Sequence, residues 1–419
     1  MARIAHLVIT WRILSMDELR YYSELLNSSG ETCKRLSIRT NTLGSSERDS
    51  QGLDVLGLER EAVRTLFNHC INAEPRRQMT LECLSFSGQD FSSTTDDLCN
   101  AVNMPGLREL YVWECQHVDT LLARLIDIFS NEPSQLHKLV IGIKYSQPSP
   151  RLIHELLQSL VGLEYLIVSH WCSSPEETKF DVRCLETHKA SLRDLYIGTG
   201  ENKTRATPLY VLPEKDMEWL VANVRALRQL AIALPEISLH DALADEWGGF
   251  GKAMVRIYCR RGAARVCTDC FQACLATLEN LVVLRVLTWP TADETITVPS
   301  GTDEVDEPKT REVYLRRLDT VATMIARFFN VTHRSSRTQR LSVVIFGSRE
   351  VFDRVRNVDG WSIRMHGPVS YKLRATLDAE CESQHYAERL EAEMVMYEEP
   401  LGCVRSSQSG QGLGPGVFE

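Results

Sequence analysis

The residues with the clearest chemical potential are four cysteines, Cys259, Cys267, Cys270 and Cys274. The two-residue gap between Cys267 and Cys270 is the spacing of zinc knuckles and redox pairs, which use thiolates. Structural zinc needs a second, separated pair of ligands, whereas positions 267, 270 and 274 are three and four apart in an apolar, helix-favouring run. We interpret these cysteines as a buried helical stripe, with a metal or redox role as the less favoured alternative.

A glycine-rich segment, Gly248 to Lys252, superficially resembles a phosphate-binding loop. A Walker loop needs a glycine where Glu246 stands and a serine or threonine where Ala253 stands. We therefore interpret the segment as a flexible connection ahead of a helix.

Catalytic motifs are absent from the sequence. It contains no Gly-x-Ser-x-Gly nucleophile elbow and no His-Glu-x-x-His metalloprotease motif. The eleven histidines are dispersed along the chain; among them are His117, His137, His154, His170, His188, His240, His333 and His366. We therefore expect a protein that is not an enzyme, with no catalytic residues, no metal ligands and no cofactor.

A short apolar pattern recurs along most of the chain. In Leu107, Leu110 and Val112 the apolar positions are three and then two residues apart. The first positions of the matches fall at 81, 107, 136, 163, 192 and 227, in steps of 26, 29, 27, 29 and 35 residues. Such steps are typical of the longest class of leucine-rich repeat, in which each match is a short strand that buries alternate residues. Helical patterns separate the strands, at 16–26, 118–129, 151–160, 182–188 and 214–224.

These elements predict an α/β leucine-rich-repeat solenoid over residues 1–365, a curved parallel sheet with helices on the convex side and irregular C-terminal repeats. An acidic segment with glycine and proline at about 291–310 predicts a flexible insertion. Residues 366–403 are expected to be a C-terminal capping region with a helix at 386–397, and residues 404–419 a disordered tail.

In such a solenoid the residues between the buried positions face the concave side and align across strands. Three columns result: Glu109, Lys138, Tyr165, Asp194, Gln229; Tyr111, Val140, Ile167, Tyr196, Ala231; and Trp113, Gly142, Ser169, Gly198, Ala233. Aromatic side chains beside charges are typical of protein-binding patches. The candidate binding residues are Glu109, Tyr111, Trp113, Tyr165, Ser169, Asp194 and Tyr196. Alternatively, the chain's own C-terminal segment covers Val140 and Ile167.

Composition limits the function classes. The 419 residues are 43% hydrophobic and 25% charged, within the range of soluble globular proteins, and the net charge of -9 argues against a general nucleic-acid binder. Thirteen cysteines without a repeating framework favour reduced thiols, and therefore the cytoplasm or nucleus. The apolar run from Ile4 to Ile9 is too short for a signal peptide or a membrane span, so we expect no membrane partner.

The strands and the irregular helices between them resemble the leucine-rich-repeat region of filamentous-fungal F-box proteins over about residues 1–365. The resemblance is carried by the segments Ile4–Ile9, Leu107–Val112, Leu163–Val168 and Leu192–Ile197. In that family an N-terminal F-box docks on the Skp1 subunit of a cullin ubiquitin ligase, and the repeats select the substrate.

The resemblance therefore implies a non-enzymatic interaction scaffold that recognises protein substrates on its concave face. No leucine-proline-led F-box precedes Ile4. We expect Skp1 and cullin as partners only if an F-box lies upstream of this sequence. The alternative is a free-standing repeat scaffold or regulator.

Overall fold

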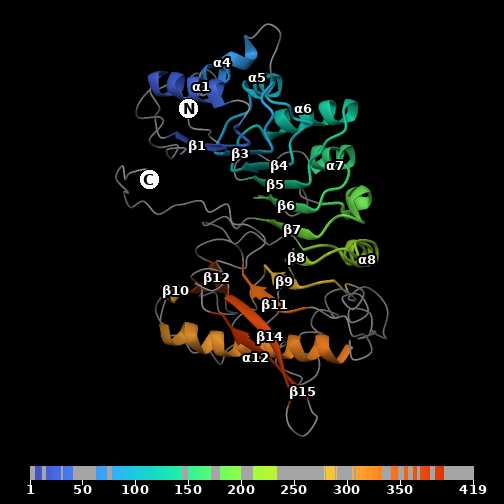
Figure 1. The fold of residues 1–419 in the computed structure, drawn as a ribbon. Helices are drawn as coiled ribbons and strands as arrows, with labels where there is room; N and C mark the ends of the chain where they lie inside the picture. Colours follow the sequence, from blue (N-terminus) through green and yellow to red (C-terminus); the bar gives the residue numbers. More distant parts are fainter. Residues whose placement is uncertain are drawn as a thin grey trace.

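The computed structural model describes residues 5–11, 16–29, 32–40, 63–72, 78–143, 150–170, 180–199, 211–233, 278, 280–287, 289, 304–305, 308–332, 341–347, 353–356, 362–365, 369–377 and 383–390. Within these residues the main element is a 12-stranded sheet, and a 3-stranded sheet lies beside it. The chain therefore has an α/β fold built on one long, mostly parallel sheet (Figure 1).

The first nine strands of the main sheet follow one another in chain order. They are β1 His6–Trp11, β2 Arg35–Thr40, β3 Cys83–Ser87, β4 Glu109–Trp113, β5 Lys138–Ile143, β6 Tyr165–His170, β7 Asp194–Thr199, β8 Gln229–Ile232 and β9 Val283–Val286. Each is parallel to its neighbours. Parallel neighbours need a crossover between them, and from β1 to β8 helical segments supply it.

Helical segments connect these strands and line one face of the sheet (Figure 1). They are α1 Met16–Ser29, α4 Asn68–Ile71, α5 Thr95–Ala101, α6 Val118–Asn131, α7 Pro150–Ser159, the 3₁₀ helix η1 Val182–His188 and α8 Glu214–Asn223. The predicted helices at 16–26, 118–129, 151–160 and 214–224 are confirmed, and segment 182–188 is helical in the tighter 3₁₀ form. Packed side chains between these helices and the strands form the main core.

The main core depends on a ladder of leucines at one register position of successive strands. The leucines of this ladder are each at most 2% exposed. They are Leu84, Leu110, Leu139, Leu166, Leu195 and Leu230. A repeated backbone bond joins the units just before each strand. For example, the Arg108 carbonyl accepts N–H bonds from His137 at 3.0 Å and Lys138 at 3.1 Å. The carbonyls of Glu82, His137, Glu164 and Arg193 each accept the corresponding pair.

The direction of the main sheet changes near the C-terminus. Strand β11 (Val343–Phe346) is parallel to β9, but β14 (Val369–Leu377) and β15 (Ser383–Arg389) form an antiparallel hairpin beside it. Helix α12 (Pro308–Thr332) packs on this hairpin (Figure 1). The smaller sheet contains β10 (Glu304–Val305), β12 (Asp353–Arg356) and β13 (Ser362–Met365).

Two expectations for the C-terminal region need correction. Residues 386–389 of the expected helix at 386–397 belong to β15, so the main sheet continues beyond residue 365. Their helix-favouring composition is overridden by pairing with β14, in which Leu373 lies opposite Ala387. The expected insertion at 291–310 contains β10 and the start of α12. Residues 291–303 and the predicted tail, 404–419, lie outside the described residues.

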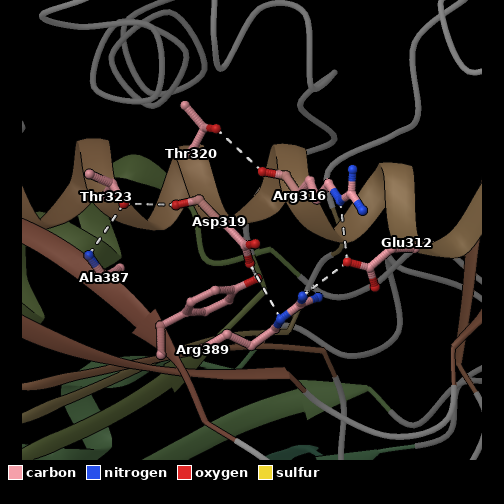
Figure 2. A network of polar contacts seen from close by, with 8 residues as sticks. Glu312, Arg316, Asp319, Thr320, Thr323, Ala387 and Arg389 are labelled. Carbon is pink, nitrogen blue, oxygen red and sulfur yellow. Dashed lines mark hydrogen bonds and ion pairs between the residues drawn. The ribbon is translucent and has the colours of Figure 1, made fainter.

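A polar network joins α12 to the hairpin (Figure 2). Asp319 Oδ1 accepts a hydrogen bond from the Tyr371 hydroxyl at 2.8 Å and lies 3.7 Å from Arg389 Nε. Arg389 Nη2 donates to Glu312 Oε1 at 3.2 Å. Burial, followed by the charge of Asp319, raises the pKa of Tyr371, so its hydroxyl stays protonated and can donate. The network therefore connects one face of α12 to both strands of the hairpin.

Replacing Tyr371 with phenylalanine should lower the free energy of unfolding by about 1 kcal/mol, because the partly exposed Asp319 carboxylate loses a hydrogen bond from a buried hydroxyl with little change in packing volume. Chemical denaturation measures the effect. Tyr21→Phe is the control, because Tyr21 is 61% exposed on α1 and should leave stability unchanged. Equal stability of Tyr371→Phe and wild type would contradict a stabilising role for this hydrogen bond.

Candidate functional site

The sheet face opposite the helices, called here the second face, carries the three predicted columns in register. Backbone pairing aligns Glu109, Lys138, Tyr165, Asp194 and Gln229 as the first column. It aligns Tyr111, Val140, Ile167, Tyr196 and Ala231 as the second, and Trp113, Gly142, Ser169 and Gly198 as the third. Ala233 follows β8 and bridges to Val211. The candidate residues are therefore neighbours on one face.

The central part of the second face is buried. Its side chains form a second apolar cluster: Val140, Tyr165, Ile167, Tyr196, Ala231, Ala233 and Leu287. Three of the candidate binding residues, Tyr165, Ser169 and Tyr196, are only 6%, 4% and 5% exposed. Val140 and Ile167 are likewise only 2% and 1% exposed, and among the described residues Leu287 packs in their cluster, so coverage by the C-terminal segment stays a prediction.

Two glycines of the third column leave room for the large side chains beside them. A Cβ added to Gly142 would lie 2.1 Å from the six-membered ring of Trp113. A Cβ added to Gly198 would lie 2.8 Å from Leu287 and 3.0 Å from the Tyr196 ring. The missing side chains let Trp113, Tyr196 and Leu287 approach the sheet backbone closely at these two positions.

Charged side chains of the first column contact aromatic rings of the first and second columns. Arg35 Nη2 lies 3.2 Å from Glu109 Oε1, and the Tyr111 hydroxyl donates to Glu109 Oε2 at 2.9 Å. The Lys138 ammonium lies 5.3 Å from the Tyr111 ring centroid and 4.2 Å from that of Tyr165, within range of cation–π attraction. Burial, reinforced by Glu109, raises the pKa of Tyr111. These contacts hold the rings and charges in fixed positions.

Further along the first column, Asp194 and Gln229 are register partners. Asp194 Oδ1 and Gln229 Oε1 are buried acceptor atoms without a hydrogen-bond partner. Burial raises the pKa of Asp194 to about 6, although the positive charges of Lys138, Arg228 and Arg193 act in the opposite direction. Near neutral pH the ionised Asp194 carboxylate therefore lowers the stability of the folded state.

The candidate residues thus fall into two groups. Glu109, Tyr111, Trp113 and Asp194 are partly exposed, whereas Tyr165, Ser169 and Tyr196 are buried. The sequence interpretation began its columns at residue 109, but pairing extends them through β3 and β2. The added residues are Arg35, Ser37, Arg39, Cys83, Ser85 and Ser87. The same alternation, applied to the matches before residue 107, could have identified them.

A carboxylate–imidazole pair lies where β3 and β4 end. Asp90 Oδ1 is 2.9 Å from His117 Nδ1 and accepts from the Ser92 backbone N–H at 2.7 Å. No serine, threonine or cysteine among the described residues hydrogen-bonds to the His117 ring. His117 has a left-handed φ of 49° immediately before α6. The pair therefore positions the start of α6, and no described nucleophile completes it as a catalytic triad.

The described cysteines are free and buried: Cys33, Cys70, Cys83, Cys99, Cys115 and Cys184. Burial raises the pKa of Cys83 to about 11 and that of Cys99 to about 12, which keeps both thiols protonated. Among the described residues no cluster of three or more histidine, cysteine or acidic side chains could hold a metal. The segments Cys259–Cys274 and Gly248–Lys252 lie outside them.

The chain matches no protein-family model and has no significant sequence match among curated proteins. In the described part of the chain, no helix combines the length and apolar character that crossing a membrane requires.

The raised pKa of Asp194 gives a pH-dependent prediction. The folded state holds the Asp194 proton more tightly than the unfolded state. The contribution of this proton to the free energy of unfolding is therefore full below pH 3.8 and is lost as the pH rises through about 6. Asp194→Asn should therefore raise the free energy of unfolding near neutral pH by about 1 kcal/mol, a value reduced to allow for partial exposure.

This gain should shrink as the pH falls through about 6, and denaturation curves across the acidic range would measure it. Asp96→Asn on α5 is the control, since the Asp96 side chain is 84% exposed. A gain from Asp194→Asn that does not change with pH would contradict the assignment.

Proposed function

We propose that the chain is a leucine-rich-repeat interaction domain that recognises a protein partner through the second face of its sheet. Further, we propose that it selects substrates for a cullin ubiquitin ligase and is not itself an enzyme. The observation that carries the proposal is the in-register placement of Glu109, Tyr111 and Trp113 at the partly exposed part of that face. Rigid aromatic side chains beside fixed charges are the usual anchors of protein interfaces.

The surrounding contacts support this assignment. The Glu109 carboxylate holds the Tyr111 hydroxyl at 2.9 Å, and the Trp113 ring lies over Gly142. Both aromatic side chains are therefore positioned before a partner arrives, which lowers the entropy lost on binding. The buried cluster centred on Ile167 supports them from the adjacent strands.

The ligase context rests on the resemblance to the repeat region of F-box proteins. The full-length product of the gene, purified from its native cells with and without proteasome inhibition, tests it. Recovery of Skp1, together with a partner that accumulates on inhibition, would support substrate selection. Recovery of a partner whose level does not change, without Skp1, would instead support a free-standing scaffold in the cytoplasm or nucleus.

Substitution of the two exposed anchors gives a direct test of the face. Tyr111→Ala and Trp113→Ala should each reduce recovery of the partner by about tenfold, because interface aromatic residues contribute much of the binding free energy. Quantitative mass spectrometry of the purified complexes measures recovery, and thermal unfolding shows whether each variant stays folded.

Two control variants separate recognition from stability. Tyr21→Ala removes an exposed aromatic side chain on the helical side of the molecule and should leave recovery unchanged. Ile167→Val trims a buried residue of the second face and should lower stability by about 1 kcal/mol without reducing recovery. Unchanged recovery with both folded anchor variants would refute the proposal.

A further inference from the structure

The second face has a distinct polar part over β2, β3 and β4. Its second column runs from Val8 through Ser37 and Ser85 to Tyr111, so two small side chains lie between two larger ones. The third column there consists of Arg39, Ser87 and Trp113. We call the set Ser37, Arg39, Ser85 and Trp113 the donor patch.

Hydrogen-bond donors of this patch have no partner in the described part of the chain. The Arg39 guanidinium forms no hydrogen bond or ion pair there, although it is half-buried. The hydroxyls of Ser37 and Ser85 and the Trp113 indole N–H form no hydrogen bonds there either. None of these four donor groups is a fully buried unpaired atom, so a ligand rich in acceptors can reach them without displacing an internal partner.

The charges around the patch favour a ligand with a single negative charge. Arg35, the other arginine of β2 on this face, is already paired with Glu109 at 3.2 Å. Arg39 is therefore the cation of the patch that is free to bind an anion, and the Glu109 carboxylate opposes additional negative charge. One guanidinium matches one carboxylate in a two-bond geometry, whereas a phosphate dianion usually needs several cations.

We infer that the donor patch binds an aspartate or glutamate side chain of a peptide segment in the partner. The carboxylate accepts from Arg39 and from the Ser85 hydroxyl, and a residue beside it in the peptide packs on Tyr111 and Trp113. The Trp113 indole N–H is placed to donate to the peptide because the benzene edge of this ring faces Gly142. This inference rests on the proposed function and gives the chemistry of the partner.

Pools of short synthetic peptides with one fixed residue test the inference. Each pool contains glutamate, glutamine, phosphoserine or lysine at that position and is passed over the immobilised full chain, and the retained peptide is quantified. The glutamate pool should be retained about tenfold or more above the glutamine pool, because the carboxylate forms charge-assisted bonds. Arg39→Gln should bring that ratio close to one, and Ser85→Ala should lower it.

Arg225→Gln, in the exposed turn after α8, is the matched control and should keep the preference for glutamate. Arg39→Lys keeps the positive charge but cannot form the two-bond geometry, so this variant should retain part of the preference for glutamate. Equal retention of the glutamate and glutamine pools, stronger retention of the phosphoserine pool, or a full glutamate preference in Arg39→Gln would each overturn the inference.

The cellular partner separates this inference from the proposed function. Reduced recovery with Tyr111→Ala but full recovery with Arg39→Gln would leave the proposed function standing and refute the carboxylate site. Full recovery with both variants would refute the two together.

Discussion

The arrangement of this molecule depends on alternation along parallel strands that pair in register. Leu110 and Val112 enter the main core, so Tyr111 between them must lie on the second face. Because each strand repeats this pairing, the intervening residues form columns that run across the sheet. A shift of one residue in the pairing would bring charged side chains into the leucine ladder. Because burying those charges would destabilise the fold, the register that forms the core also fixes the candidate surface.

The same constraint explains why the second face differs along its length. Near β4 to β9 several of its intervening residues, among them Val140, Ile167 and Tyr196, are large and apolar, and they pack into a second buried cluster. Over β2 and β3 they are serines and arginines that cannot form such a cluster, so donors such as Arg39 stay available for a ligand. At the C-terminal end, the antiparallel hairpin and the Asp319–Arg389 contact on α12 replace the parallel pattern.

Local patterns were sufficient to predict the parallel strands of the main sheet and their register, because the alternation that buries Leu139 or Leu166 can be read in a few residues, but they did not predict β10, β12 or β14. The strand at 383–389 could not be read in this way, since its composition favours a helix and its partner β14 decides its state. Burial of Tyr165 and Tyr196 was not predicted, because their cluster includes residues far apart along the chain, from Val140 to Leu287. Side-chain pairing, such as Arg35 with Glu109 across Cys83, is a further tertiary result.

The central claim is that a protein partner binds the partly exposed portion of the second face. Hydroxyl-radical footprinting of the unmodified chain, with and without the partner recovered from cells, tests it without a substitution. The account predicts that oxidation of Tyr111 and Trp113 falls in the complex, while oxidation of Tyr21 on α1 stays the same. Protection of Tyr21 with no change at Tyr111 and Trp113 would place the partner on the helical side and contradict the account.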